Sequence, residues 1–303
     1  MSERRIMITG GGGFVGQALV LGFAELGWQV VAIDLAFDGP PSHARVQHVV
    51  ADLSEGERVE AAGVDVIVHA AWVTTDPATL GISGAEYRTK NLAPLETALS
   101  LATQCCPGAF VFVSSSGVFA ADDAEGGLSD AHVPTGSSPY AVTKLRGERL
   151  VSVWGNERPT RAYVVRLGYL FGPGEAVRPS RQSVSLVARW MEDARAGRPL
   201  EVRADDPRRE WTFTPDLAVA LERLIADPSP QGPIHLGSPH VLTDSDVAEC
   251  VAREIPGTTV VTRRAHGRVK PPMIPSEVPA LRDLEWTDPS AAIHTLVGVE
   301  AVA

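Results

Sequence analysis

Short apolar runs alternate with segments of helical periodicity along the first half of the chain. The apolar runs are almost uninterrupted, as expected for strands of a parallel sheet that is covered on both faces. The predicted strands are Arg5–Thr9, Gln29–Asp34, Val46–Ala51, Val64–Ala71, Ala109–Ser115 and Arg161–Leu167. The predicted helices between them are Phe14–Gly27, Ala93–Cys105 and Pro139–Gly155. This alternation predicts βαβ units and an α/β fold with a doubly wound, Rossmann-type parallel sheet.

The pattern changes after Pro173, where proline and arginine become frequent. Amphipathic helices are predicted at Ser183–Ala196, Pro215–Ala226 and Thr243–Glu254, and short strands at Leu200–Arg203, Pro233–Leu236 and Thr258–Thr262. Residues Arg263–Pro279 are rich in proline and basic residues, which indicates a loop. We therefore expect a first domain over residues 1–172 and a smaller mixed α/β lobe over residues 173–303, with some exchange of chain between them.

Composition and charge restrict the function classes. Apolar residues make up 44% of the chain and charged residues 21%, as in ordinary globular proteins, and the net charge is −10. That charge argues against a broad nucleic-acid surface. No apolar stretch reaches the roughly 18 residues of a membrane span, and no signal-peptide pattern precedes the first strand. The three cysteines, two of them adjacent, fit neither a disulfide framework nor a metal site, so we expect a cytoplasmic protein without metal.

A glycine-rich turn follows the first predicted strand and opens the first predicted helix. Gly10, Gly13 and Gly16 form a G-x-x-G-x-x-G pattern. Glycines allow a tight turn and a close approach of backbone N–H groups to a pyrophosphate, which the N-terminus of the following helix also attracts. We therefore expect a dinucleotide to bind Gly10, Gly13 and Gly16, together with Phe14 and Val15 between them.

Two carboxylates end the next strands. Asp34 closes the second predicted strand, where it can accept hydrogen bonds from the adenosine ribose and would repel a 2′-phosphate. NAD is therefore favoured over NADP. Asp52 and Leu53 follow the third predicted strand and are expected to contact the cofactor; Asp52 is either a helix cap or a contact to the adenine amine.

Tyr140 and Lys144 lie four residues apart at the start of the helix after the fifth predicted strand, and so share one helix face. An ammonium beside a phenol favours the phenolate and lowers its pKa from about 10. Such a phenol can exchange a proton with a substrate hydroxyl while a hydride is transferred. Ser114, Ser115 and Ser116 end the fifth predicted strand, at the sheet edge where ligands bind, and can donate to a substrate oxygen.

Taken together, these motifs resemble those of the extended short-chain dehydrogenase/reductase superfamily, and within it the NAD-dependent epimerase/dehydratase family. The matching segments, in chain order, are TGGGGFVG at Thr9–Gly16, Asp34, Ala51–Leu53, His69–Ala71, Asn91, VFVSSSGVF at Val111–Phe119, PYAVTK at Pro139–Lys144, RLGYLFGPG at Arg166–Gly174, RREWTFTPDLA at Arg208–Ala218 and LRDLEWTDP at Leu281–Pro289.

The resemblance implies roles for individual residues. It implies that Ser115 is the catalytic serine, with Ser114 and Ser116 as one-residue alternatives, and that Tyr140 is the general acid/base. Lys144 would lower the tyrosine pKa and bind the nicotinamide ribose. Ala70 and Ala71 would line the pyrophosphate side, and Asn91 would be structural.

The substrate side departs from the family pattern. Sugar-nucleotide enzymes of the family place a diphosphate-binding asparagine where this chain has Tyr169, and tyrosines where it has Phe119 and Phe171. The resemblance implies that Arg209 binds either a diphosphate or a sugar-acid carboxylate. Further residues expected at the substrate are Thr74, Thr75, Ser115, Ser116, Tyr169 and Trp211.

The sequence thus predicts an NAD-dependent enzyme that oxidises a secondary alcohol of a sugar or sugar nucleotide. An epimerase would reduce the ketone again, whereas a dehydrogenase, for example of a sugar acid, would release it. A non-catalytic dinucleotide sensor is the alternative of another class. A dehydratase would need an acidic residue beside the serine, where this chain has Ser116 and Gly117. The resemblance also implies a homodimer through the helices Ala93–Cys105 and Pro139–Gly155.

Overall fold

The computed structural model describes residues 3–40, 43–57, 59–228 and 232–300. Its central feature is a seven-stranded parallel sheet with the order β10-β6-β5-β4-β1-β2-β3. These strands are β1 (Arg5–Thr9), β2 (Gln29–Asp34), β3 (Val46–Val50), β4 (Val66–His69), β5 (Ala109–Ser115), β6 (Arg161–Leu167) and β10 (Pro233–Leu236). The predicted α/β fold with a Rossmann-type parallel sheet is confirmed.

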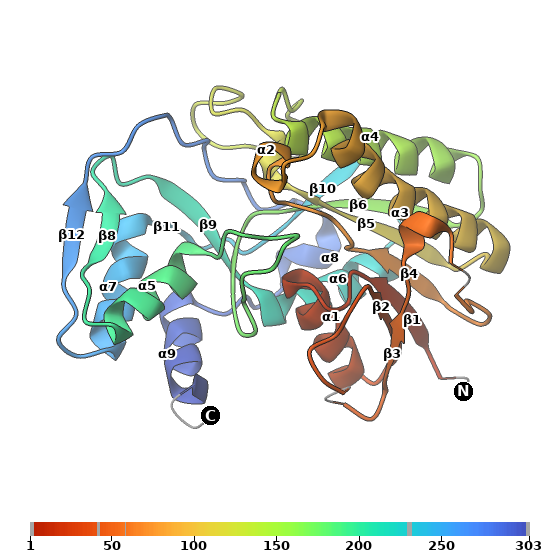
Figure 1. The fold of residues 1–303 in the computed structure, drawn as a ribbon, viewed down its shortest axis with the longest axis horizontal. Coiled ribbons are helices and arrows are strands. Elements are labelled where there is room, and N and C mark those ends of the chain that lie inside the picture. Colours follow the sequence, from red (N-terminus) through yellow and green to blue (C-terminus); the bar gives the residue numbers. More distant parts are fainter. Residues whose placement is uncertain (1–2, 41–42, 58, 229–231, 301–303) are drawn as a thin grey trace.

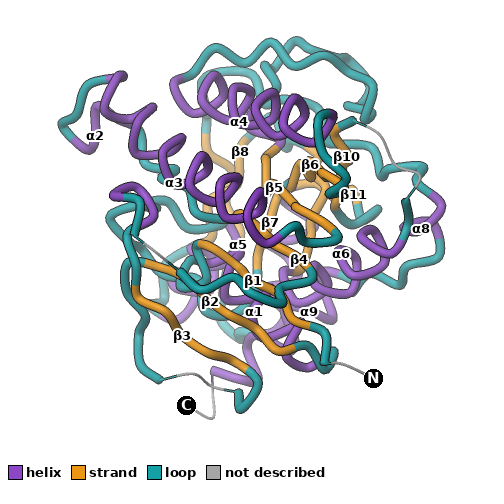
Figure 2. The backbone as a smooth tube through the Cα atoms, turned by 90° about the vertical axis from the view of Figure 1, so that its right-hand side faces the viewer, coloured by secondary structure: helices purple, strands orange, loops and turns teal. Residues whose placement is uncertain are grey.

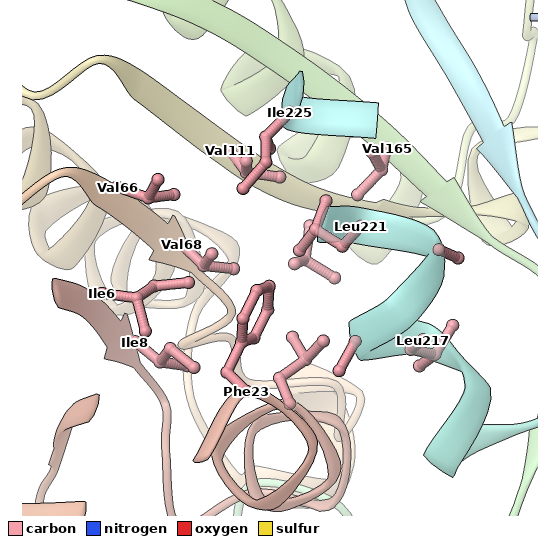
Figure 3. Close-up of a cluster of buried hydrophobic side chains, with 14 of the residues drawn as sticks. Ile6, Ile8, Phe23, Val66, Val68, Val111, Val165, Leu217, Leu221 and Ile225 are labelled. Atoms are coloured by element: carbon pink, nitrogen blue, oxygen red, sulfur yellow. The ribbon is translucent and has the colours of Figure 1, made fainter. Parts of the chain in front are cut away.

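Helices cover both faces of this sheet (Figure 2). One face is covered by α1 (Phe14–Glu25) and α6 (Leu217–Ala226), and the other by α3 (Gly84–Cys105) and α4 (Pro139–Asn156). Successive strand residues point to opposite faces, so Ile6 and Ile8 pack toward α1 while Met7 packs toward α3. Figure 3 shows Phe23 of α1 between the strand side chains and Leu221 of α6.

The smaller part lies to one side of the central sheet (Figure 1). It contains a three-stranded sheet in the order β11-β9-β7 and a pair of parallel strands, β8 and β12. Its strands are β7 (Tyr169–Phe171), β8 (Leu200–Arg203), β9 (Arg208–Phe213), β11 (Val241–Thr243) and β12 (Val260–Arg263), and its helices are α5 (Leu186–Arg195), α7 (Asp244–Glu254) and α9 (Pro289–Glu300). A separate apolar core around Trp190 and Trp211 holds these elements together.

The remaining elements are short. They are the helices α2 (Pro77–Leu80) and α8 (Pro279–Arg282) and the 3₁₀ turns η1 (Leu53–Glu55), η2 (Ser116–Val118) and η3 (Thr214–Asp216). No helix in the described ranges is long and apolar enough to cross a membrane.

Three differences from the sequence prediction have physical causes. The strand predicted for the smaller lobe at Pro233–Leu236 pairs with β6 as the edge of the large sheet, and α6 covers that sheet, so the chain passes between the two parts repeatedly. Helix α3 begins at Gly84 instead of Ala93, because Ser83 and Glu86 form a capping box ahead of a largely exposed polar turn. Strands β7, β9 and β11 were not predicted.

Helix α1 offers a matched pair of leucines to test this packing. Leu19 is 2% exposed between α1 and the sheet, whereas Leu21 on the same helix is 40% exposed. We expect Leu19→Ala to lower the free energy of unfolding by about 2–5 kcal/mol, because it removes buried methyl groups and leaves a cavity. Leu21→Ala should change it by less than about 0.5 kcal/mol. Urea unfolding of both variants measures this, and equal losses would contradict the assignment of the buried face.

Candidate active site

A cavity of about 440 Å³ opens at the carboxyl ends of the central strands, the edge at which open α/β sheets bind their ligands. Its wall is built from the turn after β1, the end of β5, the first turns of α4 and the segment joining β6 to β7. The sequence-predicted residues that line it are Gly10, Gly13, Phe14, Val15, Gly16, Ala70, Thr74, Ser115, Ser116, Tyr140, Lys144 and Tyr169. The fold thus brings residues as far apart in the sequence as Gly10 and Tyr169 together at one site.

The turn after β1 is built for a close backbone approach. Gly10 has φ of 73°, and a Cβ there would lie 2.5 Å from the backbone nitrogen of Ala71. A Cβ on Gly16 would lie 1.9 Å from the carbonyl oxygen of Gly10. Helix α1 then begins at Phe14 with no side-chain cap on its first N–H groups. This cradle fits the pyrophosphate of a dinucleotide, because uncapped N–H groups and the helix dipole both favour an anion.

Asp34 lies beside this turn at the end of β2. Its carboxylate accepts hydrogen bonds from the backbone N–H of Gly12 at 2.9 Å and of Leu35 at 2.7 Å. Burial raises the pKa of Asp34, while these hydrogen bonds and the guanidinium of Arg178 act in the opposite direction. These contacts therefore hold the Asp34 carboxylate in place beside the glycine turn.

The two residues expected next to the adenine lie outside the cavity. Asp52 caps η1 by accepting a hydrogen bond from the backbone N–H of Ser54 at 2.8 Å. Leu53 is buried in the core beneath α3. The structure thus shows the helix-cap alternative for Asp52.

Tyr140 lies in the first turn of α4, which begins at Ser138 as N-cap and Pro139. Its phenol lies beside the side chain of Ser115, the last residue of β5. Burial raises the pKa of Tyr140 to about 12, and the interaction with Ser115 lowers it only in part. Gly117 makes room for the ring, since a Cβ there would lie 2.8 Å from a Tyr140 ring carbon.

Lys144 is buried one helical turn further along α4. Its amine donates to the carbonyl oxygen of Val113 at 2.6 Å and lies 4.0 Å from the centre of the Trp72 ring. Burial lowers the pKa of Lys144 to about 7, against an upward contribution from Glu148. The sequence predicts that Lys144 lowers the pKa of Tyr140, but in the structure burial dominates both groups and favours their neutral forms.

A buried network that the sequence analysis missed lies behind these residues. The carboxylate of Glu148 on α4 accepts a hydrogen bond from Ser114 at 2.5 Å and two from Arg166 on β6, at 3.0 and 2.8 Å. Of the three serines, Ser114 thus faces Glu148, and Ser115 faces Tyr140. The spacing of Glu148, four residues after Lys144, was the available signal.

Three of the expected substrate residues do not line the cavity, namely Thr75, Arg209 and Trp211. The hydroxyl of Thr75 donates to the carbonyl oxygen of Pro179 at 3.0 Å. The guanidinium of Arg209 is buried against Asp244, with contacts of 2.5 and 3.0 Å, and stacks 4.0 Å from the centre of the Tyr169 ring. Trp211 is completely buried, and its indole N–H donates to the carbonyl of Leu242. The side chains of Arg209 and Trp211 are thus occupied by Asp244 at the start of α7 and by Leu242 on β11, and Arg209 has its counter-ion within the protein.

The segment that follows β7 supplies another part of the cavity wall, through residues between Ala176 and Ser185. The backbone N–H groups of Thr74 and Thr75 both donate to the carbonyl of Ser180, at 2.8 and 3.1 Å.

Asn91 is structural: its side chain accepts a hydrogen bond from the backbone N–H of Val73 at 2.7 Å. The cavity-lining residues that the sequence analysis missed include Trp72, Arg178, Arg181 and Lys270.

Comparison with known proteins agrees with this geometry. The family model described as "NAD dependent epimerase/dehydratase family" matches residues 6–237. The chain belongs to this family. It is accordingly an enzyme of the extended short-chain dehydrogenase/reductase type, as the resemblance predicted.

Curated relatives of this family member carry out different reactions. A 2-alkyl-3-oxoalkanoate reductase of Stenotrophomonas maltophilia is 29% identical over 227 residues, which cover 71% of this chain but only 63% of the reductase. A dTDP-glucose 4,6-dehydratase of Streptomyces niveus is 25% identical, over 82% of this chain and 77% of the dehydratase. The match to the reductase thus spans less than two thirds of its length.

Solved structures of the same fold match the whole chain. The epimerase Mth375 of Methanothermobacter thermautotrophicus superposes with a TM-score of 0.82 at 22% identity, covering 99% of this chain and 94% of that one. The NDP-hexosamine 5,6-dehydratase TunA superposes with a TM-score of 0.81 at 21% identity, covering 99% of each chain. At these identities the likeness shows the fold alone.

The close packing of Gly16 makes the pyrophosphate turn testable. We expect Gly16→Ala to weaken NAD binding by about 10- to 100-fold, because the new Cβ would displace Gly10 and with it the N–H groups aimed at the phosphates. Gly126→Ala is the control, since a Cβ at Gly126 meets nothing within 4 Å. Titration calorimetry with NAD measures both, and unchanged affinity in Gly16→Ala would contradict this role.

His69 provides a pH-dependent test of the core beneath the site. It is completely buried, hydrogen-bonded to Thr9 at 2.8 Å, and burial lowers its pKa from 6.5 to about 3. Because only the unfolded chain then binds this proton, stability is lost as the pH falls from 6.5 toward 3, with a slope of about 1.4 kcal/mol per pH unit.

We expect His69→Asn to remove this contribution, so that its unfolding free energy falls less steeply below pH 6.5 than that of the native protein. Denaturant unfolding at a series of pH values measures the two slopes. The variant of the exposed His266, His266→Asn, controls for the loss of a histidine as such. Identical slopes in the native protein and His69→Asn would refute the proposed contribution.

Proposed function

We propose that this protein uses NAD to oxidise a secondary alcohol of a sugar or sugar nucleotide, with Tyr140 as the acid/base. The observation that carries the proposal is the convergence of Ser115, Tyr140 and Lys144 on one cavity wall, beside the glycine cradle. They come from β5 and α4, so only the folded sheet edge brings them together. A sensor without catalysis would have no need of this arrangement.

Each residue has a distinct task in the proposal. Ser115, beside the phenol of Tyr140, orients the substrate hydroxyl. Tyr140 takes the hydroxyl proton as the carbon is oxidised to the ketone, and returns it in the reverse step. Bound NAD supplies the hydride acceptor. Because burial raises the Tyr140 pKa to about 12 in the protein alone, the proposed oxidation needs the positive charges of Lys144 and of the oxidised nicotinamide to favour the phenolate that accepts this proton.

NAD is favoured over NADP because of Asp34. Its carboxylate is fixed by Gly12 and Leu35 beside the pyrophosphate turn, where it can accept hydrogen bonds from ribose hydroxyls. A 2′-phosphate at the same place would meet a negative charge.

Assembly as a homodimer through α3 and α4 stays a prediction; α4 exposes Val142 and Val153.

Removal of one hydroxyl tests the proposed function. We expect Tyr140→Phe to lower turnover on a panel of sugars and sugar nucleotides by about 10²- to 10⁴-fold, with unchanged affinity for NAD, because only the proton exchange is lost. Tyr163→Phe is a matched control, since the hydroxyl of Tyr163 donates to the Asp227 carbonyl outside the cavity.

The same assay separates the remaining alternatives. Net accumulation of NADH, followed by absorbance, indicates a dehydrogenase, whereas an inverted product without net NADH indicates an epimerase. Full turnover by Tyr140→Phe would overturn the catalytic role. If neither the native protein nor this variant turned over any substrate while both bound NAD, the sensor alternative would be favoured instead.

A further inference from the structure

Lys270 enters the catalytic cavity from a segment without regular secondary structure. Residues 261–268 are exposed, but at Val269 and Lys270 the chain turns inward. The turn is fixed on both sides. The carbonyl of Gly267 accepts a hydrogen bond from Arg203 at 2.8 Å, and that of Pro272 accepts one from the backbone N–H of Leu128 at 2.9 Å. Lys270 is thereby held as part of the cavity wall.

The charged side chains that line this cavity are all cations. They are Lys144, Arg178, Arg181 and Lys270, and no carboxylate in the described ranges joins them in the wall. This local excess contrasts with the net charge of −10 of the whole chain. The cavity is therefore suited to hold more negative charge than the protein surface as a whole.

Three of these cations already have a hydrogen-bond or ion-pair partner within the protein. Lys144 donates to Val113, Arg178 pairs with Asp38, and Arg181 pairs with Glu175. Lys270, by contrast, has neither a hydrogen bond nor an ion pair among the described residues; its amine lies 5.8 Å from the centre of the Tyr169 ring. Glu210 is the acid that acts on it, through space only.

The surroundings of Lys270 favour an added anion. Burial lowers the pKa of Lys270, and the nearby guanidinium of Arg209 adds to this effect. The Oε2 atom of Glu210 accepts a hydrogen bond from the backbone N–H of Met273 at 3.1 Å, and its Oε1 atom has no hydrogen-bond partner among the described residues. A partly buried ammonium without a direct partner is costly, and an anionic ligand in the cavity would relieve that cost.

We propose that Lys270 recognises the substrate by binding one anionic group on it, a carboxylate or a single phosphoryl group. This inference rests on the proposed function, because it assumes that the substrate occupies the cavity in front of Tyr140. The anion-binding role that the sequence assigned to Arg209 thereby falls to Lys270, since Asp244 already neutralises Arg209. One free ammonium suits a single anionic group better than a diphosphate.

Calorimetry on the NAD-loaded protein tests the proposal without turnover. The probes are D-glucose, D-glucuronate, glucose 1-phosphate and UDP-glucose, which share one sugar and differ in charge. We expect the native protein to bind glucuronate or glucose 1-phosphate more tightly than glucose, and the tighter of the two identifies the anion as carboxylate or phosphoryl. UDP-glucose should gain no more from Lys270 than glucose 1-phosphate does.

Three variants assign the effect to Lys270. Lys270→Met should weaken binding of the preferred anion by about tenfold or more and leave glucose unchanged, because it keeps the apolar stem and removes the charge. Lys270→Arg should restore most of the preference. Lys90→Met removes an exposed lysine on α3 and should change nothing. All three variants should keep the native affinity for NAD.

Several results would overturn this role of Lys270. They are equal binding of glucose and both anions by the native protein, no binding of either anion, native anion affinity in Lys270→Met, or a parallel loss of NAD affinity in that variant. The proposed function fails separately: Tyr140→Phe should retain the anion preference while losing turnover. Retained turnover in Tyr140→Phe would refute the catalytic role and leave the binding result for Lys270 standing.

Discussion

The buried carboxylate of Glu148 holds helix α4 in register with the sheet. It joins α4 to Ser114 at the end of β5 and to Arg166 on β6 through three hydrogen bonds. Burying such a charge is expensive, and removal of one partner of a buried pair typically costs about 3–5 kcal/mol. The same helix carries Tyr140 and Lys144, so the position of Tyr140, the proposed acid/base, relative to Ser115 depends on this contact.

The site combines buried charges that are neutralised within the protein with cations that face the cavity. Glu148 is matched by Arg166, and Asp244 by Arg209, so these pairs fix elements and leave little charge for a ligand. Lys144 and Lys270 lie at the cavity instead. Burial works against the charged forms of Tyr140 and Lys144 alike, which makes the reactivity of the site depend on what binds in it.

Local patterns were sufficient for the parts of the chain whose role is fixed by backbone geometry. The apolar runs predicted β1, β2, β5 and β6 with their observed bounds. The role of Gly10 and Gly16 in the turn after β1 could be inferred from their spacing alone, because a turn with no room for a Cβ requires glycine at those positions. Strands β7 and β11 were missed because they have only three residues each, and β9 because it begins with charged residues, of which Arg209 and Glu210 are buried.

The sequence by itself therefore determined the parallel sheet, the pyrophosphate turn and the candidate pair Tyr140 and Lys144, since each depends on neighbours close in the chain. Only the tertiary structure decided which charges are available to a ligand. Arg209 is occupied because α7 places Asp244 against it, and Lys270 is available because a loop far along the chain turns into the cavity. The pairing of charges depends on contacts between distant segments, and no local pattern records them.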